Sequence, residues 1–343
     1  MITMFMRTIA ALCMTLAAIS NAHAAESPLE CNKTTACEFQ LYIENDSFGA
    51  GTDRYYTNGI KLGGGVNADR VINRLLQSPA KAALESISGH LGEVHVGLFL
   101  GQNMYTPRRI TEARPQPLDR PWAAWLYVGG VAQSVLGNRL QTVEIDIGMV
   151  GPAALGKQVQ TEWHKLVDAD RPEGWGNQLR NEPGVLLAYL EKWRYGPSTG
   201  LQAVPHFGMT LGNVMTLARA GGIVRIGQNM SGFGPDTIEP GGAMLQRTRL
   251  TDSQAPGNHE WYVFAGIDAR AVGRNIFLDG NTFRDSASVD RRVFVYDLKA
   301  GLSVRMAPVR LSITHVRRSE EFTTPAGGGG RQKYQSINVS WEY

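Results

Sequence analysis

Apolar and polar residues alternate with a period of two along most of the chain after residue 36. In the clearest case the two classes take turns residue by residue, in the order Thr142, Val143, Glu144, Ile145, Asp146, Ile147. Residues 336–343 repeat the pattern as far as Tyr343. Because successive side chains of a β-strand point to opposite faces, each such segment predicts a strand with one apolar and one polar face.

The alternating segments number twelve: 36–46, 56–65, 93–102, 122–135, 139–150, 184–195, 200–212, 215–228, 259–272, 290–304, 307–318 and 333–343. Many of them run ten residues or longer, and a tilted strand needs ~9–11 residues to cross a bilayer. We therefore predict an all-β fold. It is a transmembrane antiparallel β-barrel of about 12 strands, with external loops that carry a short helix.

A soluble β-sandwich would show the same alternation, so further features must decide between the two. Charged residues lie in the middle of predicted strands, as a wet or tightly paired barrel interior permits: Glu144, Asp146, Asp297 and Lys299. Aromatic residues lie near the segment ends, where an interfacial girdle would put them: Tyr42, Trp193, Tyr195, Trp261, Tyr262, Trp341 and Tyr343. Both features favour the barrel.

The even number of segments suits a barrel with both chain ends in the periplasm. The connections after odd strands are then external: 47–55, 103–121, 151–183, 213–214, 273–289 and 319–332. Two connections disagree with this pattern. Residues 66–92, with a helix-like stretch at 71–91, and residues 229–258 are long but fall on the periplasmic side, where turns are expected to be short.

Residues 1–24 are typical of a cleaved signal peptide. One positive charge precedes an apolar run at 8–20, and Ala22-His23-Ala24 offers the small–x–small cleavage pattern. The alternative is a short N-terminal anchor. We expect a single barrel domain over 25–343. Cys31 and Cys37 would be the only thiols of the exported chain, which favours a small surface disulfide over a zinc site.

Composition and motifs mainly exclude other classes of protein. Lys and Arg number 34 against 31 Asp and Glu, so the net charge is only +3. This is not the large excess of positive charge that is typical of a protein that binds nucleic acid. No stretch after the N-terminus is long and apolar enough for a helix to span a membrane. The zinc-protease motif His-Glu-x-x-His is absent.

Candidate chemistry gathers at external strand ends. Glu44-Asn45-Asp46-Ser47 closes the first strand and Thr57 lies where the second opens. Residues 158–167 predict a short amphipathic helix with an apolar stripe of Val159, Trp163, Leu166 and Val167. Gln160 and His164 stand four apart and share a neighbouring face. Each has a plainer interpretation: His164 as an interfacial residue, Asn45 and Asp46 as turn formers, and Ser47 as part of a loop rather than a nucleophile.

Several of these stretches resemble the lipid A 3'-O-deacylase family of Gram-negative outer membranes. The resemblance lies in Tyr42-Ile43-Glu44-Asn45-Asp46, in Thr52-Asp53-Arg54-Tyr55-Tyr56-Thr57-Asn58-Gly59 and in Gly101-Gln102-Asn103-Met104-Tyr105-Thr106-Pro107. Gly148-Met149-Val150-Gly151-Pro152, with Gln158-Val159-Gln160 and His164, adds to it. The combination is specific within residues 40–180, and the later strands match in pattern only.

The resemblance implies a twelve-stranded barrel that removes the 3'-linked acyloxyacyl group of lipid A in a Ca²⁺-dependent reaction. It implies that the active-site positions are Asn45, Asp46, Thr57, Gln160 and His164. Arg108 and Arg109 resemble residues near the glucosamine phosphate, in a loop that differs in length and sequence. Asp170 takes the neighbourhood of a family glutamate. The implied partner is lipopolysaccharide of the outer leaflet, with the protein a membrane-embedded monomer.

These residue types suit ester hydrolysis. An imidazole such as that of His164 can take a proton from water near neutral pH, and Asp46 offers the hard oxygen that Ca²⁺ prefers. The cation would act as a Lewis acid on the ester carbonyl. Asn45, Thr57 and Gln160 would hold water, metal shell or oxyanion. Two other functions stay open: an outer-membrane phospholipase with a serine nucleophile, and a channel or adhesion barrel without activity.

Overall fold

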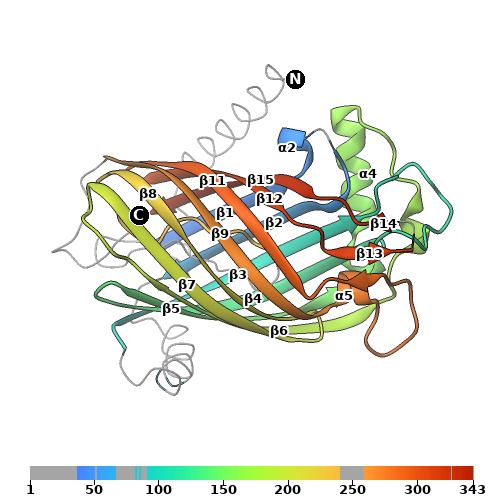
Figure 1. Ribbon diagram of the computed structural model, residues 1–343, viewed down its shortest axis with the longest axis horizontal. Helices are drawn as coiled ribbons and strands as arrows, with labels where there is room; N and C mark the ends of the chain where they lie inside the picture. Colours follow the sequence, from blue (N-terminus) through green and yellow to red (C-terminus); the bar gives the residue numbers. More distant parts are fainter. Residues whose placement is uncertain are drawn as a thin grey trace, which may run out of the picture. The chain divides into compact units, whose positions relative to one another are not determined.

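Twelve antiparallel strands form a closed barrel in the computed structural model of the chain (Figure 1). The structure describes residues 37–50, 52–66, 91–239, 259–325 and 327–342, with the single residues Ala82 and Glu85. The barrel strands are β1 (Cys37–Asn45), β2 (Tyr55–Val66), β3 (Glu93–Thr106), β4 (Ala123–Leu136), β5 (Arg139–Val150), β6 (Glu182–Trp193), β7 (Gly200–Gly212), β8 (Met215–Gln228), β9 (His259–Asn275), β11 (Phe294–Met306), β12 (Val309–Arg318) and β15 (Gln332–Glu342). The predicted fold class and strand number are confirmed.

Each barrel strand pairs with its neighbours in sequence, and β1 pairs with β15 to close the barrel, for example Tyr42 with Asn338. Alternation explains which side chains face outward. In β5, Ile145 and Ile147 are exposed on the outer wall, while Glu144 and Asp146 are buried inside. Lys61 on β2 reaches Glu144 at 2.8 Å, so a predicted mid-strand charge is paired in the interior.

The two ends of the barrel differ. One end, called here the loop end, carries the connections after β1, β3, β5, β7, β9 and β12. They include short helices and strands: α2 (Ser47–Ala50), η1 (Pro152–Ala154), α4 (Gly156–Val167), η2 (Gly174–Asn177), α5 (Ile276–Asp279), β10 (Asp290–Arg291), β13 (Phe322–Thr324) and β14 (Gly327–Gly328). β10, β13 and β14 make a separate small sheet. The predicted strand 290–304 was therefore wrong at its start, because Asp290 and Arg291 pair with β13 and not with the wall.

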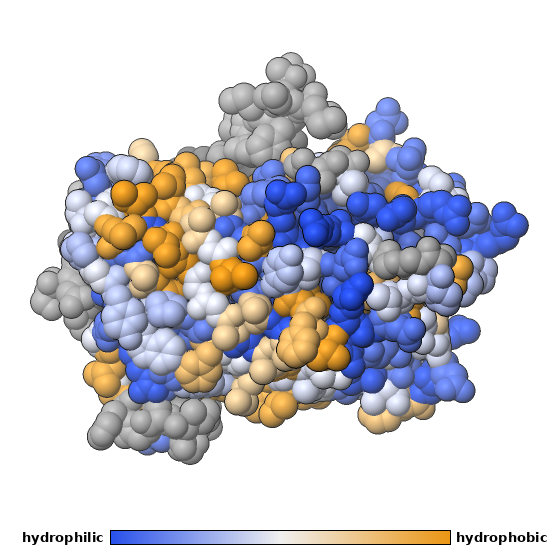
Figure 2. Space-filling view, viewed as in Figure 1, coloured by the Kyte–Doolittle hydropathy of each residue, from blue (hydrophilic) through white to orange (hydrophobic). Residues whose placement is uncertain are grey.

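The outer surface is apolar over the strands and polar at the loop end. Exposed apolar side chains on the wall include Leu98, Val128, Ile147, Leu201 and Val224. Figure 2 shows apolar side chains over much of the wall and hydrophilic ones gathered at the right, where Figure 1 draws α4, β13 and β14. A lipid-facing wall and a wetted loop end explain this division.

Part of the predicted aromatic girdle was wrong. Trp261 and Tyr195 are exposed, as a girdle requires, but Tyr42 and Tyr262 are almost fully buried. Both occupy inward-facing strand positions, since period two and not distance from the strand end decides which way a side chain points.

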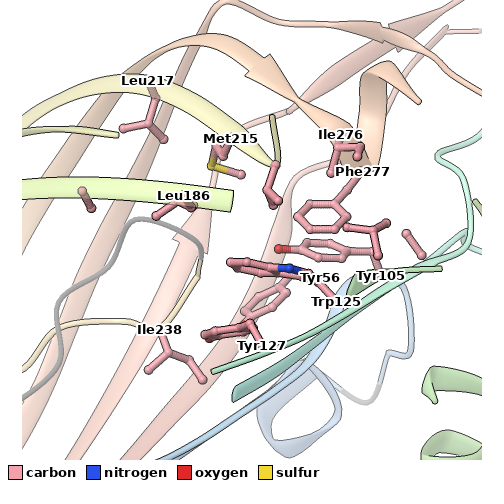
Figure 3. Close-up of a cluster of buried hydrophobic side chains, with 14 of the residues drawn as sticks. Tyr56, Tyr105, Trp125, Tyr127, Leu186, Met215, Leu217, Ile238, Ile276 and Phe277 are labelled. Carbon is pink, nitrogen blue, oxygen red and sulfur yellow. The ribbon is translucent and has the colours of Figure 1, made fainter. Parts of the chain in front are cut away.

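Aromatic side chains fill the interior toward the loop end (Figure 3). Tyr105 stacks on Phe277 with ring centroids 4.0 Å apart, and Trp125 stacks on Tyr127 at the same distance. Residues 229–239, which follow β8 at the opposite end, add to this filling, because Ile238 packs into the same cluster. The long connection that disagreed with the expected short turns thus begins with a segment inside the barrel.

Several predictions lie outside the described residues. They are the signal peptide at 1–24, the pairing of Cys31 with the Cys37 side chain, and the helix-like stretch at 71–91 apart from Ala82, Glu85 and Leu91. Among the helices that are described, none has the length and hydropathy to cross a membrane.

Candidate functional site

The candidate residues meet at the loop end of the barrel, on three neighbouring connections. The turn between β1 and β2 carries Asn45, Asp46 and Asp53, and α4, which follows β5, carries Gln160 and His164. Direct contacts join Asp53 to both α4 residues. A turn of the first hairpin and a helix more than 100 residues later therefore form one site.

The β1–β2 turn is held by the first two of these residues. Asn45 Oδ1 accepts a hydrogen bond from the Ser47 backbone N–H at 2.8 Å, which caps the start of α2. Asp46 Oδ2 accepts from the Arg54 N–H at 2.8 Å and from Thr52 Oγ1 at 2.9 Å. Both side chains thus have the turn-forming contacts that their plainer interpretation expected.

Thr57 lies at an irregularity of the wall. The register of β2 against β3 shifts between Tyr56 and Asn58, so Thr57 is the extra residue of a β-bulge. Its carbonyl accepts from the Asp46 N–H at 3.3 Å, and its Oγ1 lies 2.6 Å from Thr106 Oγ1. Its hydroxyl is buried beneath the turn and contacts β3.

Helix α4 buries its polar face and exposes its apolar one. Gly156, Gln160 and His164 are its buried residues, whereas the Leu166 side chain is 75% exposed and Trp163 37%. The predicted apolar stripe is therefore largely exposed, although Val159 is partly buried against a small apolar cluster. The reason lies in the neighbour: the helix packs across a polar turn, so hydrogen-bonding residues face it.

Gly156 lets α4 approach the wall. A Cβ at this position would lie 2.5 Å from Ala124 Cβ on β4 and 2.6 Å from the Trp175 ring. Trp175, on η2, packs there with Trp122, their ring centroids 5.0 Å apart. These contacts set the distance between helix and barrel.

A chain of hydrogen bonds orients the polar face of α4. Trp175 Nε1–H donates to Gln160 Oε1 at 2.7 Å, which turns the amide nitrogen toward Asp53. Gln160 Nε2 then donates to Asp53 Oδ1 and Oδ2 at 3.0 and 3.2 Å. His164 Nε2 lies 2.8 Å from Asp53 Oδ2, and its Nδ1 contacts the backbone carbonyl of Asp170.

Both ring nitrogens of His164 therefore face oxygen atoms. The Asp53 carboxylate raises the pKa of His164 above its usual value, and partial burial opposes this only in part. The carbonyl of Asp170 adds to the rise. Because a carbonyl only accepts, Nδ1 must carry a hydrogen, and Nε2 is the nitrogen that gains or loses a proton.

Asp46 has an unused oxygen. Its Oδ1 is buried and has no hydrogen-bond partner, in contrast to Oδ2. Burial raises the pKa of Asp46 well above its usual value, and the negative charge of Asp53 raises it further. A cation beside Oδ1 would compensate this charge, so the residue fits the Ca²⁺ that the family resemblance implies.

The described part of the chain holds no group of three or more His, Cys, Asp or Glu side chains arranged for a metal ion. A cation at Asp46 would thus need further ligands from carbonyl, amide or water oxygens. Ca²⁺ accepts such ligands readily, whereas Zn²⁺ prefers nitrogen and sulfur.

Arg108 and Arg109 are exposed on the connection after β3. An added Cβ at Gly330 would lie 3.3 Å from Arg108 Nη2, so this guanidinium lies against the connection before β15. Tyr55, two residues after Asp53, holds the same connection because its hydroxyl accepts from the Gly330 N–H at 3.1 Å.

Serine chemistry finds little support here. Ser47 is exposed and its Oγ donates to Asn45 Oδ1. The segment Gly196-Pro197-Ser198-Thr199-Gly200 fits the Gly-x-Ser-x-Gly pattern of serine hydrolases, but it connects β6 to β7 at the opposite end. A nucleophile elbow requires a strand followed by a helix, so this match has no matching structure.

Sequence reasoning missed two members of the site. Asp53 and Trp175 contact the predicted residues directly, yet only the first lies in a quoted stretch and neither was given a role. A polar Asp before the second strand was the available signal for Asp53. Trp175 had none, because its partner Gln160 lies fifteen residues away across an irregular connection.

Comparisons with known proteins agree with the fold. The profile of the family described as outer membrane protein LpxR matches residues 9–343. The structure of LpxR from Salmonella typhimurium aligns with a TM-score of 0.68 and 20% identity, covering 89% of this chain and 99% of that one. The β domain of the Bordetella autotransporter BrkA aligns at 0.40 and 10%, covering 90% and 98%.

A search of curated proteins gives no match. The family match spans nearly the whole chain. The chain therefore belongs to the LpxR family of outer membrane proteins, and it is a twelve-stranded outer-membrane β-barrel.

Proposed function

We propose that this protein is an outer-membrane lipid A 3'-O-deacylase, in which His164 activates water and Asp46 binds Ca²⁺. Membership of the LpxR family supports lipid A deacylation. The observation that carries the mechanism is the contact of both His164 and Gln160 with Asp53, beside the buried Asp46. Outer-membrane barrels direct their longer loops outward, so this site would face the leaflet that holds lipid A.

His164 supplies the base. With Nδ1–H donated to the Asp170 carbonyl, the neutral ring keeps its lone pair on Nε2, where Asp53 Oδ2 lies 2.8 Å away. Water can reach Nε2 only when the Asp53 side chain moves aside. Water placed at Nε2 would lose its proton to the ring as its oxygen attacks the ester carbonyl carbon. The ring would return that proton to the departing 3'-oxygen, so that a free carboxylic acid and a hydroxyl result.

The remaining residues bind and orient. Asp46 Oδ1 would hold the cation, which supplies Lewis-acid polarisation of the ester carbonyl when bound. Asn45 and Thr57 fix the turn that presents Asp46, and Gln160 fixes the carboxylate of Asp53. Arg108 and Arg109 offer exposed positive charge to a phosphate of the lipid A headgroup.

Replacing His164 by Ala tests this proposal. Loss of a general base lowers turnover by about 100-fold or more. Mass spectra of lipid A from cells that express H164A should retain the 3' acyl chains, while heat-modifiable mobility shows a folded barrel. The matched control is H259A, because His259 is exposed at the opposite end and should leave activity unchanged. Full deacylation by H164A would rule the mechanism out.

Calcium removal separates the metal from the base. A chelator should abolish deacylation by purified wild-type protein, and added Ca²⁺ should restore it. Asp46→Asn should need about tenfold more Ca²⁺ for half-maximal rate, because one charged ligand oxygen is lost. Undiminished activity in chelator would overturn the role of Asp46 as a metal ligand. It would not contradict the role of His164 as the base, which only an active H164A would do.

A further inference from the structure

The segment that follows β8 enters the barrel and rises toward the loop end. Met230 and Phe233 pack with Tyr262 and Phe264 in the half near β8's last residue. Thr237 Oγ1 lies 3.5 Å from Lys299 Nζ in the middle of β11. The described part of the segment ends at Glu239, which meets Arg318, the last residue of β12 at the loop end.

Buried cations hold the lower part of this segment by its backbone. Arg225 donates from Nη1 to the Ser231 carbonyl at 3.2 Å and from Nη2 to the Gly232 carbonyl at 2.9 Å. Lys192 pairs with Asp236. Gly234 has φ 81° and approaches the wall so closely that a Cβ would lie 2.4 Å from Ile223 Cδ1. Such contacts fix a chain in one path and are poorly replaced by water in a confined interior.

The upper part reaches the strand that carries the candidate site. The Ile238 N–H donates to Glu44 Oε1 at 3.0 Å, and Tyr56 Oη–H donates to Glu44 Oε2 at 2.8 Å. Glu44 directly precedes Asn45 and Asp46. Glu239 is held by Arg270 at 2.6 Å and by Arg318. Figure 3 shows Ile238 beside Tyr127, at the edge of the aromatic cluster.

We propose that residues 230–239 are a permanent internal brace that positions the β1–β2 turn from inside the barrel. The brace holds Glu44 Oε1 through the Ile238 N–H, while Tyr56 on β2 holds Oε2. It thereby helps to set the height and angle at which Asn45 and Asp46 leave β1. Ile238 is thus a positioning residue, since it acts through Glu44. The positioning role of the brace rests on the proposed deacylase function, because its test measures deacylation. The location of residues 230–239 inside the barrel does not depend on that function.

Kinetics of the Ile238 variants test the positioning role. Ile238→Pro removes the N–H that Glu44 accepts, whereas Ile238→Val keeps both the donor and a branched side chain. Small misplacements at a reacting centre cost up to about a hundredfold in rate. We expect I238P to lower kcat by about tenfold to a hundredfold with KM within about twofold, and I238V to retain wild-type kcat. A folded I238P with wild-type kcat overturns the proposal.

A second pair of variants covers the case in which I238P does not fold. Glu44→Ala removes the acceptor from the barrel side, and Glu44→Gln keeps an oxygen for the Ile238 N–H. E44A should lose kcat like I238P, and E44Q should recover most of it. Equal kcat for folded E44A and wild type contradicts the brace.

A cysteine measurement tests residence without any activity assay. In a background with Cys31 and Cys37 changed to Ser, Thr237→Cys should resist a water-soluble maleimide in the folded, membrane-embedded protein and react after unfolding. Gly176→Cys, on exposed η2, should react at once and is the control. Fast labelling at position 237 shows that the segment leaves the barrel and overturns the brace. Absence of deacylation by wild type would instead refute the proposed function alone.

Discussion

At the scale of single residues, Asp53 governs the protonation of His164. Its carboxylate contacts Nε2 at 2.8 Å and also accepts from Gln160, which itself is oriented by Trp175. This arrangement stabilises the protonated ring of His164, but a protonated ring cannot take a proton from water. The proposed reaction therefore requires a pH at which Nε2 is neutral, and Asp53 moves that requirement upward.

Changing Asp53 to Asn should move the acid limb of the rate profile. Because the carboxylate raises the pKa of His164, its removal lowers that pKa, and neutral imidazole persists to lower pH. The midpoint of the acid limb of kcat/KM should shift to lower pH, as measured by lipid A turnover across a buffer series. Asp170→Asn should shift the limb much less than D53N, because Asp170 contacts the ring through its backbone and its charge is the smallest of the contributions that raise the pKa of His164. A limb that stays in place in D53N would exclude this coupling.

Residue types predicted part of the site and not its contacts. Asp46, Gln160 and His164 were proposed because their stretches resemble the lipid A 3'-O-deacylase family and their residue types suit ester hydrolysis, and the structure brings them to one end of the barrel. The link between the turn and α4 depends on Asp53, whose position follows from how a loop of the first hairpin folds. Local sequence does not determine that path, since no periodic pattern extends into the turn.

At the scale of elements, the strands were predictable and the connections were not. All twelve barrel strands overlap the expected segments, because one face meets lipid and the other the interior along each of them. The start of β11 and the segment 229–239 were not foreseen. Both depend on partners distant in sequence, such as Phe322 for Arg291 and Glu44 for Ile238.

Helix α4 also shows the limit of predicting contacts from a local sequence pattern. Its amphipathic pattern correctly predicted a helix, but the pattern did not indicate which side faces the protein. Because α4 covers a polar turn, its polar side is buried and Trp163 and Leu166 are exposed. Amphipathicity shows that two faces differ and leaves open which of them is buried.

The approach of α4 to the wall should be sensitive to one added carbon. Gly156→Ala would place a Cβ against Ala124 and Trp175, and such overpacking costs about 1–3 kcal/mol unless the helix moves outward. Movement would separate His164 from Asp53. We expect lipid A mass spectra to show much reduced deacylation by G156A, with normal heat-modifiable mobility. Gly176→Ala meets nothing within 4 Å and should behave as wild type, and equal activity of the two variants would contradict this role.

At the scale of the whole molecule, buried ion pairs hold the interior together. Arg318 is completely buried, contacts Asp297 at 2.8 and 2.9 Å, and also pairs with Glu239. Replacing it by Met would leave two buried carboxylates, Asp297 and Glu239, to share the guanidinium of Arg270. The free energy of unfolding should fall by about 3–5 kcal/mol.

Urea titration of heat-modifiable mobility in detergent measures this change. The matched control is Arg292→Ala, whose partner Glu320 lies 2.9 Å away on the surface, with the two side chains 45% and 39% exposed. Exposed pairs of this kind contribute about 0–1 kcal/mol. Similar midpoints for R318M and R292A would show that the interior pairs add little.

The filled interior also predicts how the barrel behaves in a bilayer. Stacked aromatic rings, the internal segment 229–239 and paired charges occupy the space that a pore would need. Purified protein in a planar bilayer should give no steady ion conductance, in contrast to an open porin. Stable open-channel currents would favour the channel function over the enzyme.

The contact between β1 and β15 imposes an order of events on biogenesis. β1 has one partner directly after it in sequence, but its other partner is the distant β15, at residues 332–342. Until residues 332–342 arrive, two rows of amide and carbonyl groups stay unmatched, one on β1 and one on β12. A chain without residues 332–342 cannot close the barrel. Its unpaired strand edges then distinguish it from a copy whose barrel is closed.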